Sequence, residues 1–213
     1  MKTEGLLAVN RGLKTRKCKK RCRKCCRANL ETHANCGVFL HPSRRKRRIL
    51  PMSNKARVLK HLQALSIPCE VYEHPAVFTM EECLALPYAA PDVTFCKNIL
   101  LCNRQQTAFY LYVTLPDKPF RTADTSKLLH SSRLSFAPSE CLPTMLGLES
   151  GSLSPLGLWF DEEKRIQLVF DHDVKREGRI AFHPCDNTAT VVFAQEVFWT
   201  QVVPTLGHEP IWL

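Results

Sequence analysis

Three parts of the sequence combine polar groups with surroundings that favour ligand chemistry. They are Lys97, the segment Gly-Ser-Leu-Ser-Pro over 151–155, and His183. Lys97 lies in an apolar run, and burying an ammonium group is costly unless an anion meets it. A phosphate or a ligand carboxylate would be a suitable partner. The alternative is that the strand alternates and Lys97 points into solvent, as most lysines do.

The segment over 151–155 can hold its backbone in a fixed bend. Gly151 permits backbone angles that other residues avoid, while Pro155 fixes its own torsion and restricts Ser154. Its peptide N–H and C=O groups could therefore be held toward a small ligand or a water molecule. A plain surface turn is the alternative, because Gly, Ser and Pro are common turn residues.

His183 follows an apolar, strand-like run over 180–182 and precedes Pro184. An imidazole at a strand end could donate a hydrogen bond or carry a proton. A histidine held there only by local hydrogen bonds is the alternative. His74, in a Glu-His-Pro sequence, has the same two interpretations, and Asn187 could serve the site or fix the local turn.

The charge of the chain is divided unevenly. Residues 1–51 contain 16 Lys and Arg against 2 Asp and Glu, whereas residues 52–213 contain 14 against 18. The formal charge of +10 therefore belongs to the N-terminal extension and gives no reason to expect RNA binding by the folded body. The basic runs over 16–27 and 44–48 could contact RNA or direct nuclear import, or have no function. We expect no DNA partner.

The eleven cysteines favour a reduced, cytoplasmic protein. Six of them are scattered singly along a body with ample apolar residues, so a disulfide scaffold is not expected. The other five lie in the extension and could bind zinc only with loosely matching spacings: Cys18, Cys22, Cys25, Cys26 and Cys36, with His33 or His41 as further ligands. No run approaches the roughly 18 to 20 apolar residues that span a bilayer, so no membrane contact is expected.

The elements that must position these residues begin after Met52, itself a candidate native start. Ser53 or Asn54 could cap a helix with a periodic apolar face formed by Val58, Leu59, Leu62 and Leu65. Thr79 and Glu82 have the spacing of a capping box at the start of a helix toward Leu86. Further helices are predicted over 124–130, 138–146 and 195–206, and strands over 69–74, 94–102, 107–115, 134–137, 166–170, 180–183, 189–193 and 211–213.

This irregular alternation predicts a single α/β domain over residues 53–213, with a mixed sheet flanked by helices. The composition of residues 1–52 predicts a disordered, basic, cysteine-rich extension. No internal repeat, G-x-G-x-x-G or P-loop is present, which disfavours a doubly wound nucleotide fold and a phosphoryl-transfer enzyme.

Six segments taken together resemble the YbaK/ProRS-associated aminoacyl-tRNA editing family, in particular its free-standing PrdX branch. They are YEHPAVFTMEE over 72–82, CKNILL over 96–101, RLSFAPSE over 133–140, LGLESGSLSPLGL over 146–158, FHPCDNTATV over 182–191 and LGHEPIWL over 206–213. The resemblance covers nearly all of residues 53–213 and none of the extension. It implies a curved mixed β-sheet surrounded by helices, and it implies no metal and no organic cofactor.

The resemblance also implies a set of site residues. The family's lysine corresponds to Lys97, and its histidine corresponds to His183. The family's G-x-x-x-P loop corresponds to Gly151, Ser152, Leu153, Ser154 and Pro155, and substrate contacts are expected from Phe78, Thr79, Asn98 and Asn187.

The activity implied is hydrolysis of mischarged tRNA, chiefly alanyl-tRNA(Pro) made in error by prolyl-tRNA synthetase. The expected partners are therefore mischarged tRNA(Pro) and, second, the synthetase itself. A synthetase cannot strongly exclude a slightly smaller amino acid, because a methylene is worth only about 1–3 kcal/mol; a small second site can then exclude the larger correct product. The alternative is a non-catalytic module that binds tRNA or the synthetase through the same pocket.

Overall fold

A computed structural model describes residues 52–149 and 151–213. The predicted extension, with its zinc and RNA alternatives, lies outside the described residues except for Met52, and the domain boundary at residue 53 stays a prediction. Within the described residues, no helix has the length and apolar character needed to cross a membrane.

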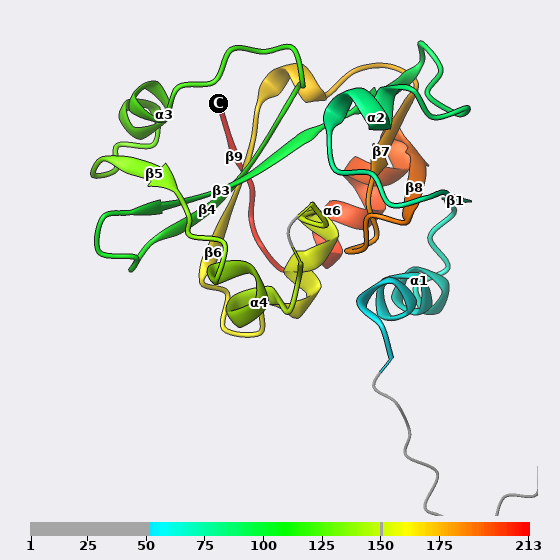
Figure 1. Ribbon diagram of the computed structural model, residues 1–213, viewed down its shortest axis with the longest axis horizontal. Coiled ribbons are helices and arrows are strands. Elements are labelled where there is room, and N and C mark those ends of the chain that lie inside the picture. The colour runs from blue at the N-terminus through cyan, green and yellow to red at the C-terminus, as the bar shows by residue number, and fades with distance from the viewer. Residues whose placement is uncertain (1–51, 150) are drawn as a thin grey trace, which may run out of the picture. The chain divides into compact units, whose positions relative to one another are not determined.

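The α/β fold class is confirmed, but the strands form two sheets rather than one (Figure 1). The first sheet has the order β1-β8-β7-β2, with β1 Glu70–Glu73, β8 Ala189–Ala194, β7 Arg179–Phe182 and β2 Val93–Phe95. The second has the order β5-β3-β4-β6-β9, with β5 Leu134–Phe136, β3 Lys97–Asn103, β4 Phe109–Thr114, β6 Ile166–Phe170 and β9 Ile211–Trp212. Both sheets mix parallel and antiparallel pairs.

One continuous stretch of chain joins the two sheets. The predicted strand over 94–102 divides at Cys96, because β2 pairs with β7 while β3 pairs with β4 and β5. Lys97 is the first residue of β3 and lies immediately after this change of partner. The strands predicted over 94–102 and 107–115 meet as a hairpin of β3 and β4, with Lys97 paired to Thr114.

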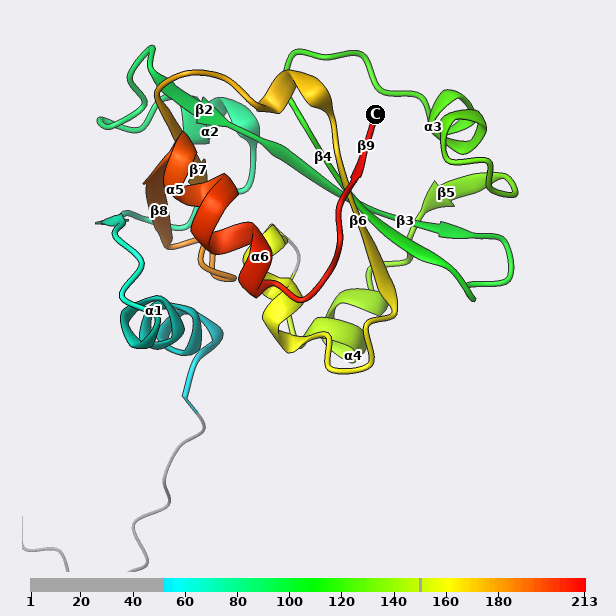
Figure 2. The same ribbon diagram turned by 180° about the vertical axis from the view of Figure 1, so that it is seen from behind.

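The first sheet lies between two helical layers. The helical segment comprising α5 Gln195–Val197, the π-helical turn η3 Phe198–Val202 and α6 Val203–Thr205 covers one face of β7 and β8, and α2 Met80–Leu84 covers the other (Figures 1 and 2). Alternation along β7 explains this arrangement, since Ile180 and Phe182 join the main core while Ala181 packs with Cys83 of α2.

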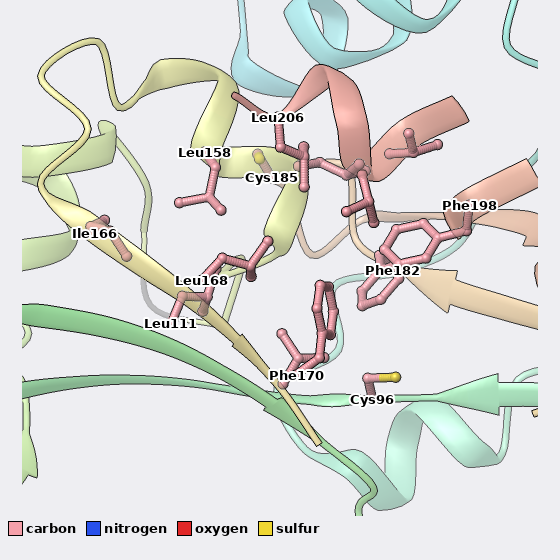
Figure 3. Close-up of a cluster of buried hydrophobic side chains, with 14 of the residues drawn as sticks. Cys96, Leu111, Leu158, Ile166, Leu168, Phe170, Phe182, Cys185, Phe198 and Leu206 are labelled. Carbon is pink, nitrogen blue, oxygen red and sulfur yellow. The ribbon is translucent and has the colours of Figure 1, made fainter. Parts of the chain in front are cut away.

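The predicted helix over 195–206 is present, but it is divided into the three parts α5, η3 and α6. Pro204 lacks an N–H and cannot donate to the carbonyl of Thr200, and a π-turn directly before a proline relieves this mismatch. Phe198 on this segment packs on Phe182 at a ring separation of 4.8 Å, beside Phe170 and Cys96 in the same core (Figure 3). These contacts fix the helical segment against the end of β7.

The remaining helices largely follow their capping signals. Ser53 caps α1 Asn54–Ala64, whose Val58 and Leu62 are buried, whereas Leu65 ends the helix and is 42% exposed. The capping box of Thr79 and Glu82 is confirmed, although α2 ends at Leu84. The other helical elements are α3 Thr122–Leu128, α4 Cys141–Leu146 and the 3₁₀ turns η1 Pro155–Phe160 and η2 His172–Val174.

Gly147 ends α4 with φ of 65°, a left-handed conformation that is common at the residue after a helix. Its carbonyl accepts a hydrogen bond from the Asn54 side chain at 2.6 Å, which ties α1 to the segment before Gly151.

Candidate active site

A cavity of about 400 Å³ lies where the β2–β3 chain passes the end of β7. Its walls come from this chain, from the segment leading into α2, and from the loop that contains Gly151. Seven of the eleven predicted site residues line it: Phe78, Thr79, Lys97, Asn98, Gly151, Leu153 and His183. The lysine, the glycine loop and the histidine, far apart in the sequence, therefore share one cavity.

Lys97 contributes the cationic group of the cavity. Its side chain is half-buried, and it makes no ion pair or hydrogen bond with the rest of the described chain. A half-buried ammonium without a protein partner is well suited to an anionic ligand, since the cost of its burial is then offset.

Asn98 joins the strand to the glycine loop. Its Nδ2 donates to the carbonyl of Leu153 at 3.0 Å, whereas its Oδ1 is buried and finds no donor among the described residues. A buried acceptor without a donor lowers stability and is typical of residues retained for a site. Asn98 thus holds Leu153 beside the first residues of β3, at the edge of the cavity.

The loop over 151–155 presents only part of itself to the cavity. Gly151 has φ of 85°, a left-handed conformation that favours glycine. The hydroxyl of Ser152 donates to the carbonyl of Glu149 at 2.6 Å, and that of Ser154 accepts from the N–H of Leu156 at 3.3 Å. Ser152, Ser154 and Pro155 are buried and do not line the cavity; the two serine hydroxyls are used within the turn, and Pro155 begins η1.

His183 has two ring nitrogens with different roles. Nδ1 lies 2.8 Å from the carbonyl oxygen of Ala189, which can only accept, so Nδ1 carries the proton and Nε2 is an acceptor whose protein donor is the weakly donating Cys83 thiol. The Sγ of Cys83 lies 3.8 Å from Nε2. Burial lowers the pKa of His183; the hydrogen bond to Ala189 opposes this in part, and His74 and Asp186 make still smaller contributions that lower and raise it. The imidazole is therefore held neutral, with an acceptor toward the cavity.

A short hydrogen-bond chain supports His183 from behind. Nδ1 of His74 donates to the carbonyl of Pro75 at 2.8 Å, so its Nε2 accepts from the hydroxyl of Thr190 at 3.0 Å. The Thr190 oxygen lies 3.4 Å from Nδ1 of His183, as a second and weaker acceptor. His74 is thus linked to His183 by hydrogen bonds through Thr190, and its ring also lies 5.7 Å from the His183 ring, centroid to centroid.

The segment before α2 forms one side of the mouth. The carboxylate of Glu82 accepts from the N–H of Phe78 at 2.6 Å and from that of Thr79 at 3.1 Å. These two backbone donors lower the pKa of Glu82. Asn187, predicted to contact substrate, instead holds this segment, because Val77 exchanges two hydrogen bonds of 3.1 Å with it.

Several residues of the cavity were missed at the sequence level. Cys83 and Thr190 meet His183 from α2 and β8, and the apolar walls include Val77, Met80 and Ala181. Cys83 lies four residues after the helix cap Thr79, so capping and helical period together indicate that it points inward. Thr190 could not be recognised, since only the pairing of β8 with β1 and β7 brings it near His183.

No cluster of three metal-ligating side chains occurs within 52–149 and 151–213. The six cysteines of this part of the chain are free thiols, and burial raises the pKa of Cys83. These groups are therefore poor candidates for thiolate chemistry.

The fold and cavity define an α/β domain with a cationic, histidine-containing pocket built on backbone turns. The chain belongs to the aminoacyl-tRNA editing domain family, whose sequence model matches residues 74–198. The family resemblance predicted from the six segments is thereby confirmed.

Two curated relatives are similar over most of their length. Prolyl-tRNA editing protein ProX of Acetoanaerobium sticklandii is 32% identical over 147 residues, which cover 69% of this chain and 89% of ProX. Prolyl-tRNA synthetase associated domain-containing protein 1 of Bos taurus is 33% identical over 162 residues, covering 74% of this chain and 92% of the bovine protein.

A solved structure supports the fold. It is described as a candidate trans-editing enzyme for prolyl tRNA synthetase, and it matches with a TM-score of 0.58 and 17% identity over 76% of this chain and 98% of its own. At this identity the match shows a shared fold alone.

Proposed function

We propose that this chain is a trans-acting deacylase that hydrolyses the ester of mischarged tRNA, with alanyl-tRNA(Pro) as its main substrate. The observation that carries the proposal is the convergence of Lys97, Gly151 and His183 on one cavity in a member of the editing family. The similarity to prolyl-tRNA editing protein ProX supports prolyl-tRNA synthetase as the enzyme whose errors are corrected.

The reaction asks little of the protein. An aminoacyl ester is already activated, so water can add to its carbonyl carbon if the two are positioned and the developing oxyanion is stabilised. The bond to the ribose oxygen then breaks, giving a free amino acid and a tRNA with a free hydroxyl. No strong nucleophile is needed, consistent with the raised pKa of Cys83.

Each side chain has a role that suits its geometry. Nε2 of His183 can accept a hydrogen bond from the attacking water and orient it, because a water is a stronger donor than the Cys83 thiol that lies 3.8 Å away. Lys97 can bind a phosphate or the terminal adenosine, because its ammonium has no partner in the described chain. The backbone of Gly151 and Leu153 supplies the polar wall for the amino-acid moiety.

Selectivity is assigned to the apolar walls. Val77, Met80 and Ala181 line the cavity, and we assign them to the subsite for the side chain of the amino acid. A cavity that admits the alanyl group and excludes the larger prolyl group would supply the second step of discrimination after a synthetase that attaches either amino acid to tRNA(Pro).

The test uses the full-length chain with radiolabelled alanyl-tRNA(Pro) and prolyl-tRNA(Pro). We expect alanyl-tRNA(Pro) to be cleared and prolyl-tRNA(Pro) to survive. Lys97→Ala should lower kcat/KM by about 10- to 100-fold, the value of a charged hydrogen bond, with an unchanged Tm. Lys127→Ala is the matched control, since Lys127 is an exposed lysine on α3. Folded protein that binds tRNA but clears neither substrate would replace the proposal with a non-catalytic binding module.

A further inference from the structure

Phe78 is an apolar side chain left in solvent at the entrance of the cavity. It is 72% exposed, more than any other large hydrophobic side chain in the described part of the chain. It also lines the cavity that contains Lys97 and His183. Exposed apolar residues are common, so the exposure by itself says little, and its meaning depends on how the ring is held.

The main chain under this ring is fixed at three points. The N–H of Phe78 donates to the Glu82 carboxylate at 2.6 Å, and Val77 exchanges two hydrogen bonds of 3.1 Å with Asn187. These bonds fix the main chain, so a ligand that packs on the phenyl ring has to order only the two side-chain torsions of Phe78. The backbone thus holds the base of the ring at the entrance of the cavity.

The position of the ring relates it to the substrate. A Cβ built on Gly151 would lie 3.7 Å from Cδ1 of Phe78, so the ring packs beside the glycine loop. If the ester enters the cavity, the ribose that carries it lies at the mouth, and the base attached to that ribose is the nearest flat group to Phe78. This base is at a single-stranded 3′ end, so no nucleotide follows it and its outer face is free to stack.

We infer that Phe78 is a stacking platform for the unpaired terminal base of the tRNA 3′ end. The inference rests on the proposed function and assigns the ligand of one part of that site: a nucleobase face. Stacking on an aromatic side chain needs only the flat face of a base and no contact with the rest of the tRNA. Phe78 can therefore hold the terminal nucleotide of any tRNA. Lys97 and Phe78 then hold the nucleotide while the aminoacyl group enters the cavity.

A thermodynamic cycle on binding tests the contact separately from catalysis. The probes are two single-stranded RNA oligonucleotides, one ending in CCA and one with an abasic residue in place of the terminal adenosine. Affinities are measured for the wild-type chain, Phe78→Ala and Phe78→Trp. Phe136→Ala is the matched control, because Phe136 is 63% exposed and belongs to β5 of the other sheet.

We expect removal of the base to weaken binding to the wild type by about 5- to 100-fold and to leave binding to Phe78→Ala almost unchanged. Phe78→Trp should retain the discrimination, and Phe136→Ala should match the wild type. Equal discrimination by wild type and Phe78→Ala would overturn the inference, because the terminal base would then be recognised by another residue. Because no ester is cleaved in this assay, its outcome is distinct from that of the deacylation test.

Discussion

At the scale of single residues, the two nitrogens of His183 are the most informative groups of the site. The carbonyl of Ala189 holds the proton on Nδ1, so the chemistry available to the cavity is that of an acceptor, not of a donor. The groups that face this ring are Cys83 from α2, His74 after β1 and Asp186 from the following loop. Two of them carry or could carry charge, yet burial dominates and keeps the imidazole neutral.

This arrangement predicts a pH dependence with a definite sign. Because the pKa of His183 lies below its ordinary value of about 6.5, Nε2 is unprotonated at neutral pH and can accept a hydrogen bond. It loses this ability only when it is protonated, as the pH falls through the lowered pKa. We expect kcat/KM for alanyl-tRNA(Pro) to be flat near pH 7 and to fall on the acid side below pH ~6.5. His183→Gln should remove this acid limb along with most of the activity. An acid limb that persists in His183→Gln would assign it to another group.

Sequence could predict part of this chemistry and not the rest. Lys97 and His183 were identified from their neighbours and from the family resemblance, and the structure places both at one cavity. The partners that tune His183 were not identified, because Thr190 and Cys83 reach it only through strand pairing and helix packing. Asn187 was assigned to substrate, but its bonds to Val77 depend on a contact between segments 110 residues apart.

At the scale of elements, the segment from Val77 to α2 shows how a local signal places a site residue. The capping box spacing of Thr79 and Glu82 was visible in the sequence, and the same carboxylate also accepts from Phe78. Strand boundaries were less accessible. The run over 94–102 has uniform β character, and its division at Cys96 depends on partners that come from distant parts of the chain.

The capping interaction predicts a selective effect on the mouth of the cavity. Glu82→Gln weakens the acceptor of two backbone N–H groups, so residues 77–80 should exchange amide hydrogen faster and KM should rise several-fold with a smaller change in kcat. Glu81→Gln is the matched control, since Glu81 belongs to the same first turn but accepts neither bond. Identical exchange in the two variants would show that Glu82 does not hold the segment.

At the scale of the whole molecule, Asp171 is the buried charge on which the second sheet depends. It follows β6 and accepts hydrogen bonds from Tyr112 of β4 at 2.7 Å and from Lys118 at 2.6 Å. Burial by itself raises the pKa of Asp171, but the hydrogen bonds from Lys118, the N–H of Asp173 and Tyr112 together bring it below the usual value. Burial, with the bond to Asp171, raises the pKa of Tyr112 to about 12.

The stability of the fold should therefore depend on pH through Asp171. A carboxyl group with a lowered folded-state pKa contributes its full stability above the unfolded pKa of about 3.9, and loses it as the pH falls through the folded value. Asp171→Asn should lower the free energy of unfolding at pH 7 by about 2–4 kcal/mol and flatten the loss below pH ~4, as measured by urea titration. Asp173→Asn, at a more exposed carboxylate on the same lysine, should cost under about 1 kcal/mol.

The single residue between β2 and β3 has a mechanical consequence. Cys96 is buried and is the only residue of this connection, so a movement of one sheet against the other changes the backbone torsions on either side of it. Lys97 is the next residue, and its position therefore depends on the angle between the sheets. A ligand that contacted both the end of β7 and the start of β3 would restrict this movement. Ligand binding in the cavity would then reduce motion in both sheets, including strands that the ligand does not contact.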